Sequence, residues 1–356
     1  MPRLKPKRYL ALAKNFHAMM RKTSALLLLI IFATSPVGQS RNEPLTQPAL
    51  PVAGTSPAPT PTLAERLGFK VSDRVLIVNG DDVGMSHAAN AATIDALENG
   101  LMTSATIMVP CPWFPEIAAY AKAHPNSDFG LHLTHTSEWK TYRWGPVASK
   151  SDVPGLVDPD GYLWPDIMSV YKNSTPEQAE REARAQIKKA LAAGVDVTHL
   201  DSHMGALQFD DRYFQVYRRL AKEFDVPLRM GSQEILAGAG GGHQRAQLDA
   251  DRIIYPDYLV HGGRKKGESV KDYWKRNLRD LKPGVTELYI HAALAGEEMQ
   301  SITNSWQERA TEHELFTKDA EIRELLNSLG VKRVGFRALR DLQRKNRKPN
   351  AGQTQQ

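Results

Sequence analysis

The sequence predicts an α/β protein that forms a distorted or incomplete (β/α) TIM-like barrel with mostly parallel strands. Between about residues 72 and 340, short β-rich runs alternate with helical runs. This alternation is typical of parallel strands with helices outside the sheet. Polar residues also follow directly after several of the strand-like runs, where an α/β fold places its site. Six or seven such units suit a barrel better than a simple open sheet.

The first half of this region contains the clearest elements. We expect strands over residues 74–78, 102–109 and 129–134, and helices over residues 86–99 and 114–124. After a long loop comes a helix capped by Ser174 or Thr175, with Pro176 in its first turn. This helix runs to Ala193 and ends at Gly194.

The second half continues the alternation without a sequence repeat. We expect strands over residues 195–200, 226–230, 286–291 and 331–337, and helices over residues 210–224, 269–281 and 312–329. The pattern therefore predicts one continuous domain over residues 67–340.

The first 40 residues have the composition of a signal peptide. They hold seven Lys and Arg and no Asp or Glu, and an apolar run occupies residues 24–33 before small residues that continue to Ser40. A helix that spans a membrane needs about 20 apolar residues, so this run is too short to be one. We expect an exported protein, periplasmic or secreted, without a stable membrane span.

The charge distribution argues against a nucleic-acid partner. The chain has a formal net charge of +6, but outside residues 1–40 the remaining 39 Lys and Arg face 40 Asp and Glu. The single cysteine, Cys111, excludes an intrachain disulfide. We expect a Pro-rich disordered linker over residues 41–66 and a basic disordered tail over residues 341–356.

Four short motifs place acidic and histidine side chains after strands. They are VNGDDVG at 78–84, GLHLT at 130–134, HLDSH at 199–203 and ELYIH at 287–291. Carboxylate and imidazole groups are ligands for Zn²⁺, Mn²⁺, Fe²⁺ or Co²⁺. Of two adjacent carboxylates, one can bind the metal while the other takes a proton from water, and a histidine opposite them can protonate a leaving amine. These are the groups that amide hydrolysis needs.

Together with TSATIMV at 103–109, these motifs resemble the YdjC-like (ChbG/HpnK-type) carbohydrate deacetylase family over about residues 72–340. The resemblance implies a distorted (β/α) barrel that removes N-acetyl groups from amino sugars such as chitooligosaccharides with one divalent metal ion, Mg²⁺ or Zn²⁺. By motif position it implies Asp82, His132 and His203 as metal ligands. It likewise implies Asp81 as the catalytic base and His291 as the catalytic acid.

Three further polar residues lie near these motifs. We expect Asp201 to orient a ligand histidine, while His199, four residues before His203, is an alternative ligand. Arg229 lies on the strand expected over 226–230 and is expected to hold Asp81 ionised or to touch the substrate, with a structural ion pair as the alternative.

Aromatic residues are concentrated in the loop after the strand that carries His132. Trp139, Tyr142 and Trp144 lie within six residues of one another. Their flat faces and polar edges suit sugar rings, so Trp139 and Trp144 are candidates for substrate binding, with packing of the loop as the alternative.

The sequence therefore predicts a metal-dependent hydrolase that deacetylates amino sugars or acetylated oligosaccharides by metal-activated water. Two alternatives stay open: a carbohydrate O-acetyl esterase, and a glycan-binding protein that keeps the barrel without turnover. The expected partner is an acetylated carbohydrate. The sugar, its chain length, the native metal and the oligomeric state, with a homodimer among the options, are left open by the sequence.

Overall fold

The structure is a computed structural model that describes residues 60–347. The expected signal peptide and most of the expected linker lie outside the described residues. No helix within residues 60–347 has the length and apolar character needed to cross a membrane.

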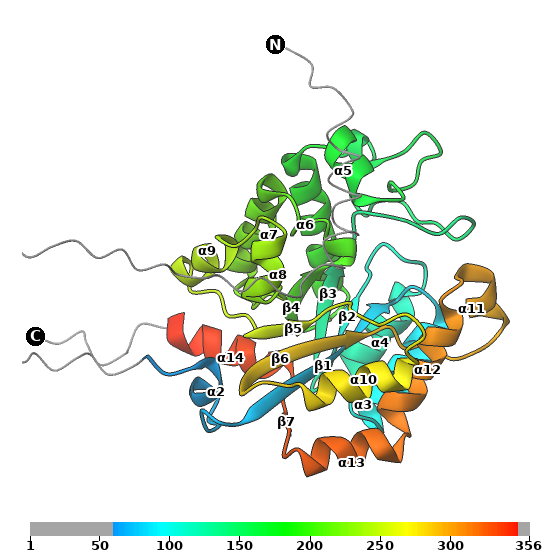
Figure 1. Cartoon of the computed structure of the whole chain (residues 1–356). Helices are drawn as coiled ribbons and strands as arrows, with labels where there is room; N and C mark the ends of the chain where they lie inside the picture. The colour runs from blue at the N-terminus through cyan, green and yellow to red at the C-terminus, as the bar shows by residue number, and fades with distance from the viewer. Residues whose placement is uncertain (1–59, 348–356) are drawn as a thin grey trace, which may run out of the picture. The chain divides into compact units, whose positions relative to one another are not determined.

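All strand pairs of the main sheet are parallel, in the order β4-β3-β2-β1-β6-β5, and β7 also pairs with β1 (Figure 1). The strands are β1 (Arg74–Val83), β2 (Ser104–Ile107), β3 (Phe129–Leu133), β4 (Val197–Ser202), β5 (Tyr258–Val260), β6 (Gly284–Ile290) and β7 (Lys332–Arg333). Parallel pairing brings the carboxyl ends of consecutive strands to one edge, so the motifs expected to carry chemistry meet there.

Hydrogen bonds of the segment around Leu228, which is not itself one of the named strands, link β4 to the chain just before β5. Leu200 of β4 forms an isolated parallel bridge with Leu228. The Leu228 N–H then donates to the Ile254 carbonyl, in the chain that leads into β5. The result is a distorted (β/α) barrel, which confirms the predicted fold class.

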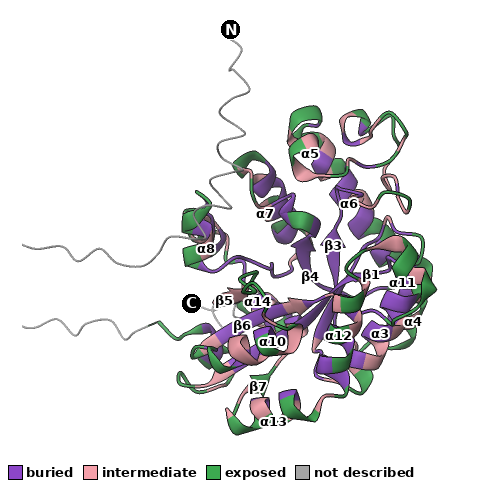
Figure 2. Ribbon diagram, turned by 45° about the vertical axis from the view of Figure 1, so that its right-hand side comes forward, coloured by how far each residue is buried: buried purple, intermediate pink, exposed green. Residues whose placement is uncertain are grey.

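Helices cover the outside of the sheet and turn their buried sides toward it (Figure 2). They are α2 (Leu63–Arg66), α3 (His87–Glu98), α4 (Phe114–Ala123), α5 (Ile167–Asn173), α6 (Pro176–Ala192), α7 (Asp211–Phe224), α8 (Gln233–Gly238), α9 (Gln244–Ala250), α10 (Val270–Arg279), α11 (Glu297–Ile302), α12 (Trp306–Thr317), α13 (Ala320–Ser328) and α14 (Phe336–Arg347). Nine of the ten residues of the central strand β1 are buried because neighbours flank it on both edges and both faces.

Helices α6 and α3 begin at side-chain caps, and the cap at Thr175 is one of the two candidates that the sequence predicted. Thr175 caps α6 by accepting a hydrogen bond from the Gln178 N–H, and Pro176 occupies the first turn. Ser86 caps α3 in the same way by accepting from the Ala89 N–H. These caps fix the residue at which each helix starts.

Three predicted elements differ from the structure. The strand expected over 226–230 is only the bridge at Leu228, and the helix expected over 312–329 is two helices because Asp319 caps a new one, α13. Of the strand expected over 331–337, only Lys332–Arg333 (β7) is a strand, because α14 begins at Phe336. Phe336 and Leu339 of α14 are fully buried against residues of α2, β1 and β6, and this burial favours the helix.

The structure also moves two expected boundaries. Helix α2 lies inside the expected linker, and its N-cap Thr62 forms a capping box with Glu65. Helix α14 extends the body past residue 341 to Arg347, which pairs with Asp225 at 2.7 Å. Residues 348–356 lie outside the described part of the chain.

A buried histidine makes stability depend on pH. His135 is fully buried, its ring nitrogen Nε2 lies 3.0 Å from the Ala179 carbonyl, and burial lowers its pKa to about 4. Unfolded histidine has a pKa of about 6.5, so between about pH 6.5 and 4 only the unfolded chain gains this proton and stability falls.

We predict that His135→Gln, which keeps a donor for Ala179, removes part of this loss. Between pH 7.5 and 4.5, urea unfolding should show the wild type losing about 2–3 kcal/mol more than the variant. The exposed His124→Gln is the control and should retain the wild-type slope. Identical slopes for wild type and His135→Gln would contradict the prediction.

Candidate active site

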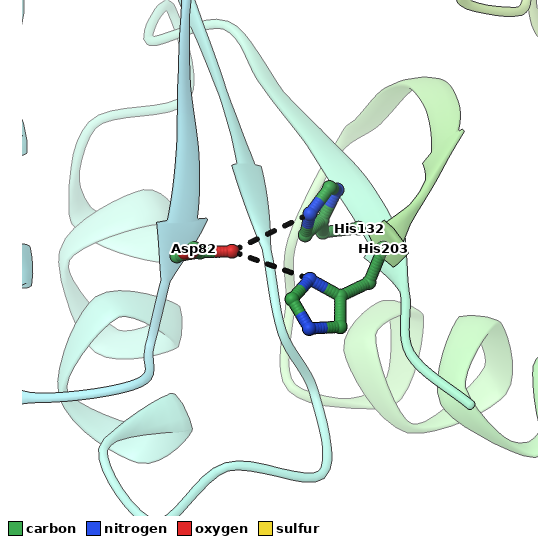
Figure 3. Close-up of side chains that lie close together, drawn as sticks. All are labelled: Asp82, His132 and His203. Atoms are coloured by element: carbon green, nitrogen blue, oxygen red, sulfur yellow. Dashed lines mark ion pairs between the residues drawn. The ribbon is translucent and has the colours of Figure 1, made fainter. Parts of the chain in front are cut away.

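The carboxyl ends of three strands bring together the three side chains expected to bind metal. Asp82 lies near the end of β1, His132 on β3, and His203 directly after β4. Asp82 Oδ1 lies 3.4 Å from His132 Nε2 and 3.4 Å from His203 Nδ1. Figure 3 shows the carboxylate directed toward both imidazole rings. All three residues are at most 4% exposed.

The backbone of β1 is distorted where it carries Asp82. Asp82 has φ 62° and Gly84 has φ 90°, and the pairing with β2 shifts register between Gly80 and Val83. A positive φ is uncommon outside glycine, although aspartate tolerates it better than most residues. Such local strain is concentrated at functional sites, and here it coincides with the residue that faces both histidines.

The three side chains fit a divalent cation. Their ligand atoms lie within 4.8 Å of one another, and the buried Asp82 Oδ1 has no hydrogen-bond partner among the described residues. His132 directs Nδ1 to the Asp201 carboxylate, and His203 Nε2 lies 3.0 Å from Glu138. Each ring therefore turns its second nitrogen toward Asp82, the arrangement in which a carboxylate orients a metal-ligating histidine.

The electrostatics of the cluster favour positive charge. Burial opposes protonation of both rings, but Asp201 and Asp81 raise the pKa of His132 to about 10. Glu138 and Asp82 likewise raise the pKa of His203 to about 9. Without a cation these histidines would carry protons, and a bound metal would displace them.

Arg229 pairs with Asp81, whose Oδ2 lies 4.0 Å from His132 Nε2. Its two terminal nitrogens each lie 2.7 Å from an Asp81 oxygen, and Asn79 donates a further hydrogen bond at 2.9 Å. Burial raises the pKa of Asp81, but Arg229 and His132 outweigh it and hold the pKa below its ordinary value. Arg229 also contacts Asp201 at 2.8 Å and Glu287 at 2.7 Å.

Two residues that the sequence did not single out complete the surroundings of the cluster. Glu138 is the partner of His203, and Arg309 of α12 donates to Asp82 Oδ2 at 2.7 Å. Because Arg309 occupies Oδ2, only Oδ1 faces the histidines. Neither residue belongs to a strand-end motif, so spacing alone gave no signal for them.

His291 follows the last residue of β6. The β1–β6 ladder pairs Gly80 with Ile290, so the next residues along the two strands are Asp81 and His291. The His291 N–H donates to Glu312 Oε2 at 2.7 Å. Burial lowers the pKa of its imidazole, against the opposing effect of Asp82 and Asp81, so the ring is neutral near pH 7.

Similarity to known proteins shows the family of this chain. A family model described as YdjC-like protein matches residues 75–328. The chain belongs to the YdjC-like family. A carbohydrate deacetylase from Brevibacillus brevis is 30% identical over 274 residues, which cover 74% of this chain and 99% of the relative. One from Thermus thermophilus is 33% identical over 258 residues, covering 70% of this chain and 89% of the relative.

A solved structure also resembles this YdjC-like chain. It is an Enterococcus faecalis protein assigned as a cellobiose-phosphate cleavage protein, with a TM-score of 0.65 and 26% identity. The alignment covers 75% of this chain and 99% of that one. The comparisons confirm the predicted family and the prediction that the chain belongs to a family of hydrolases. The residue roles remain predictions.

The structure separates the other predicted site residues. Asp201 contacts His132, as expected of a residue that orients a ligand. His199 is not with the metal-ligand cluster, because its ring stacks on Phe336 with centroids 3.7 Å apart. Trp144 is 3% exposed and donates to the Thr136 carbonyl, which favours the alternative in which it packs the loop. Trp139 is half-buried, and the guanidinium carbon of Arg309 lies 5.7 Å from the centroid of its ring.

We predict that His203→Ala weakens metal binding by more than about 100-fold, because two remaining ligands leave an incomplete site. Metal content after dialysis of the folded protein measures the effect. The matched control is His135→Gln, which changes a buried histidine outside the cluster and should keep its metal. Full occupancy in His203→Ala would refute the proposed ligand set.

Proposed function

We propose that this YdjC-like protein is a metal-dependent deacetylase that removes N-acetyl groups from amino sugars of the chitooligosaccharide class. The observation that carries the proposal is the buried group of Asp82, His132 and His203, with Asp81 and His291 at adjacent strand ends. The names of the curated relatives support a carbohydrate substrate. Two imidazole nitrogens in the ligand set favour Zn²⁺ over Mg²⁺.

Asp81 is the proposed proton acceptor. When bound, a divalent cation supplies Lewis acidity that polarises the acetyl carbonyl and makes water a stronger acid. Asp81 has a lowered pKa because Arg229 holds both its oxygens, so it accepts a proton only from water that has been acidified. Because Asp81 is a weak base, its proposed role requires a cation that makes the water more acidic.

His291 is the proposed proton donor to the leaving nitrogen. Its ring is neutral near pH 7 because burial lowers its pKa, so it must gain a proton before it can give one. The proton taken up by Asp81 is a source at the adjacent strand end. This transfer would return the site to its starting charge after each turnover.

Acetate release tests the proposed function. The purified protein, loaded with about one equivalent of Zn²⁺ or Mg²⁺, is incubated with acetylated mono- and oligosaccharides. We predict that wild type releases acetate and that Asp81→Asn, which keeps all three ligands, retains metal but loses about 10²–10⁴-fold in rate. Equal metal loss in Asp81→Asn and Asp82→Asn would show that the two carboxylates are misassigned. Binding without any acetate release would favour a glycan-binding protein.

Substitution of His291 tests whether the protein cleaves an amide or an ester bond. An amide nitrogen leaves poorly unless it is protonated, whereas an activated ester oxygen leaves with less help. We predict that His291→Ala depresses N-acetyl hydrolysis at least about tenfold more than hydrolysis of an activated acetyl ester, with metal content unchanged. Equal losses on both substrates would contradict the acid role, and efficient hydrolysis of sugar O-acetyl groups alone would favour an esterase.

A further inference from the structure

Arg309 is buried beside Asp82 and uses only part of its hydrogen-bonding capacity. It is 7% exposed, and all three nitrogens of its guanidinium carry N–H donors. Its Nη2 donates to Asp82 Oδ2 at 2.7 Å, and its Nε donates to Ser305 Oγ at 3.2 Å. The third nitrogen, Nη1, is buried and has no hydrogen-bond partner among the described residues. A buried donor of a charged group is costly to leave without a partner, and such exceptions are expected where a ligand binds.

The first turn of α12 holds this guanidinium close to the proposed proton donor as well. The Ala293 N–H, two residues after His291, donates to the Arg309 carbonyl at 3.3 Å and ties α12 to the loop after β6. Burial lowers the pKa of the His291 imidazole, and the positive charge of Arg309 lowers it further against the effect of Asp82. Arg309 therefore lies beside a proposed metal ligand and within electrostatic reach of His291.

The Asp82–Arg309 pair leaves two buried atoms of opposite kind without hydrogen-bond partners among the described residues. Asp82 Oδ1 is an acceptor, Arg309 Nη1 is a donor, and the contact between Oδ2 and Nη2 joins the two groups. Oδ1 faces both histidines and is placed to bind a cation. Nη1 suits an oxygen that carries negative charge. A carbonyl oxygen that gains negative charge next to a cation meets both requirements.

We infer that Arg309 is a further catalytic residue, whose Nη1–H donates a hydrogen bond to the acyl oxygen of the substrate and to the acetate that is released. The inference rests on the proposed function. When water adds to the acetyl carbon, its proton goes to Asp81 and the electron pair of the C=O bond goes to the acyl oxygen, where Nη1–H stabilises the negative charge. When this pair returns, the C–N bond breaks and the nitrogen takes a proton from His291. Donors fixed in advance at such an oxygen contribute strongly to catalysis.

Arg309→Lys tests this donor, because lysine keeps a cation for Asp82 but lacks the second arm of the guanidinium. With the β-1,4-linked trimer of N-acetylglucosamine and saturating Zn²⁺, kcat should fall about 10²–10³-fold while KM changes less than about threefold. Arg309→Gln, which can still donate to Asp82, is a second variant and should lose at least as much. Arg264→Lys is the matched control, because Arg264 pairs with Glu308 next to Arg309, and it should keep the wild-type kcat.

Acetate binding gives a readout that does not depend on turnover. Calorimetry of acetate with the Zn²⁺-loaded protein should give a dissociation constant about tenfold weaker in Arg309→Lys than in wild type, and an unchanged one in Arg264→Lys.

Three outcomes would overturn the role of Arg309 while acetate release by the wild type still upholds the deacetylase. They are unchanged acetate binding in Arg309→Lys, a rise in KM without a loss of kcat, and a loss of kcat that only follows loss of Zn²⁺ from both variants. The last would mean that Arg309 acts only through Asp82. Acetate binding that depends on Arg309, without acetate release from any sugar, would uphold the acetate site and overturn the deacetylase.

Discussion

The positively charged side chain of Arg229 lies inside the barrel and holds three carboxylates in place. Its guanidinium contacts Asp81, Asp201 and Glu287, all buried. Buried charges are tolerated only when they are compensated, and one arginine cannot balance three acids together with Asp82 nearby. Arg309 supplies a second positive charge. Burial raises the pKa of Glu287 to about 7, which reduces its negative charge near neutral pH. Protonated His132 and His203 supply the remaining positive charge, and a divalent cation that displaced their protons would supply it in their place.

The same network explains why the ligand histidines point where they do. Asp201 receives Arg229 on one oxygen and His132 on the other, so it links the charge network to the proposed first ligand sphere. Asp82 is divided in the same manner between Arg309 and the two rings. Asp201 and Asp82 thus each direct one oxygen to an arginine and the other to a ligand histidine, and these contacts orient the rings.

Residues that follow parallel strands were predictable from the sequence because the topology forces those strand ends together. This is why the acidic and histidine residues of the four motifs could be expected at one edge, whereas the choice of Asp82, His132 and His203 as ligands came from the family resemblance. Glu138 and Arg309 come from a long loop and from a helix more than 200 residues after Asp82, and no periodicity links such positions. The environments of His199 and Trp144 were equally hidden, because their partners Phe336 and Thr136 are set by tertiary packing.

Helices α2 and α14 pack together against the amino ends of β1 and β6, where Leu63, Phe336 and Leu339 form a small core of their own with Val75 and Val285. Both helices lie on the side away from α5 and the long loop that precedes it (Figure 1). The two ends of the described body therefore lie by the amino ends of β1 and β6, whereas the metal cluster lies at the carboxyl ends of the strands. Attachment of the body through either of these ends would therefore leave the edge that carries the metal cluster free.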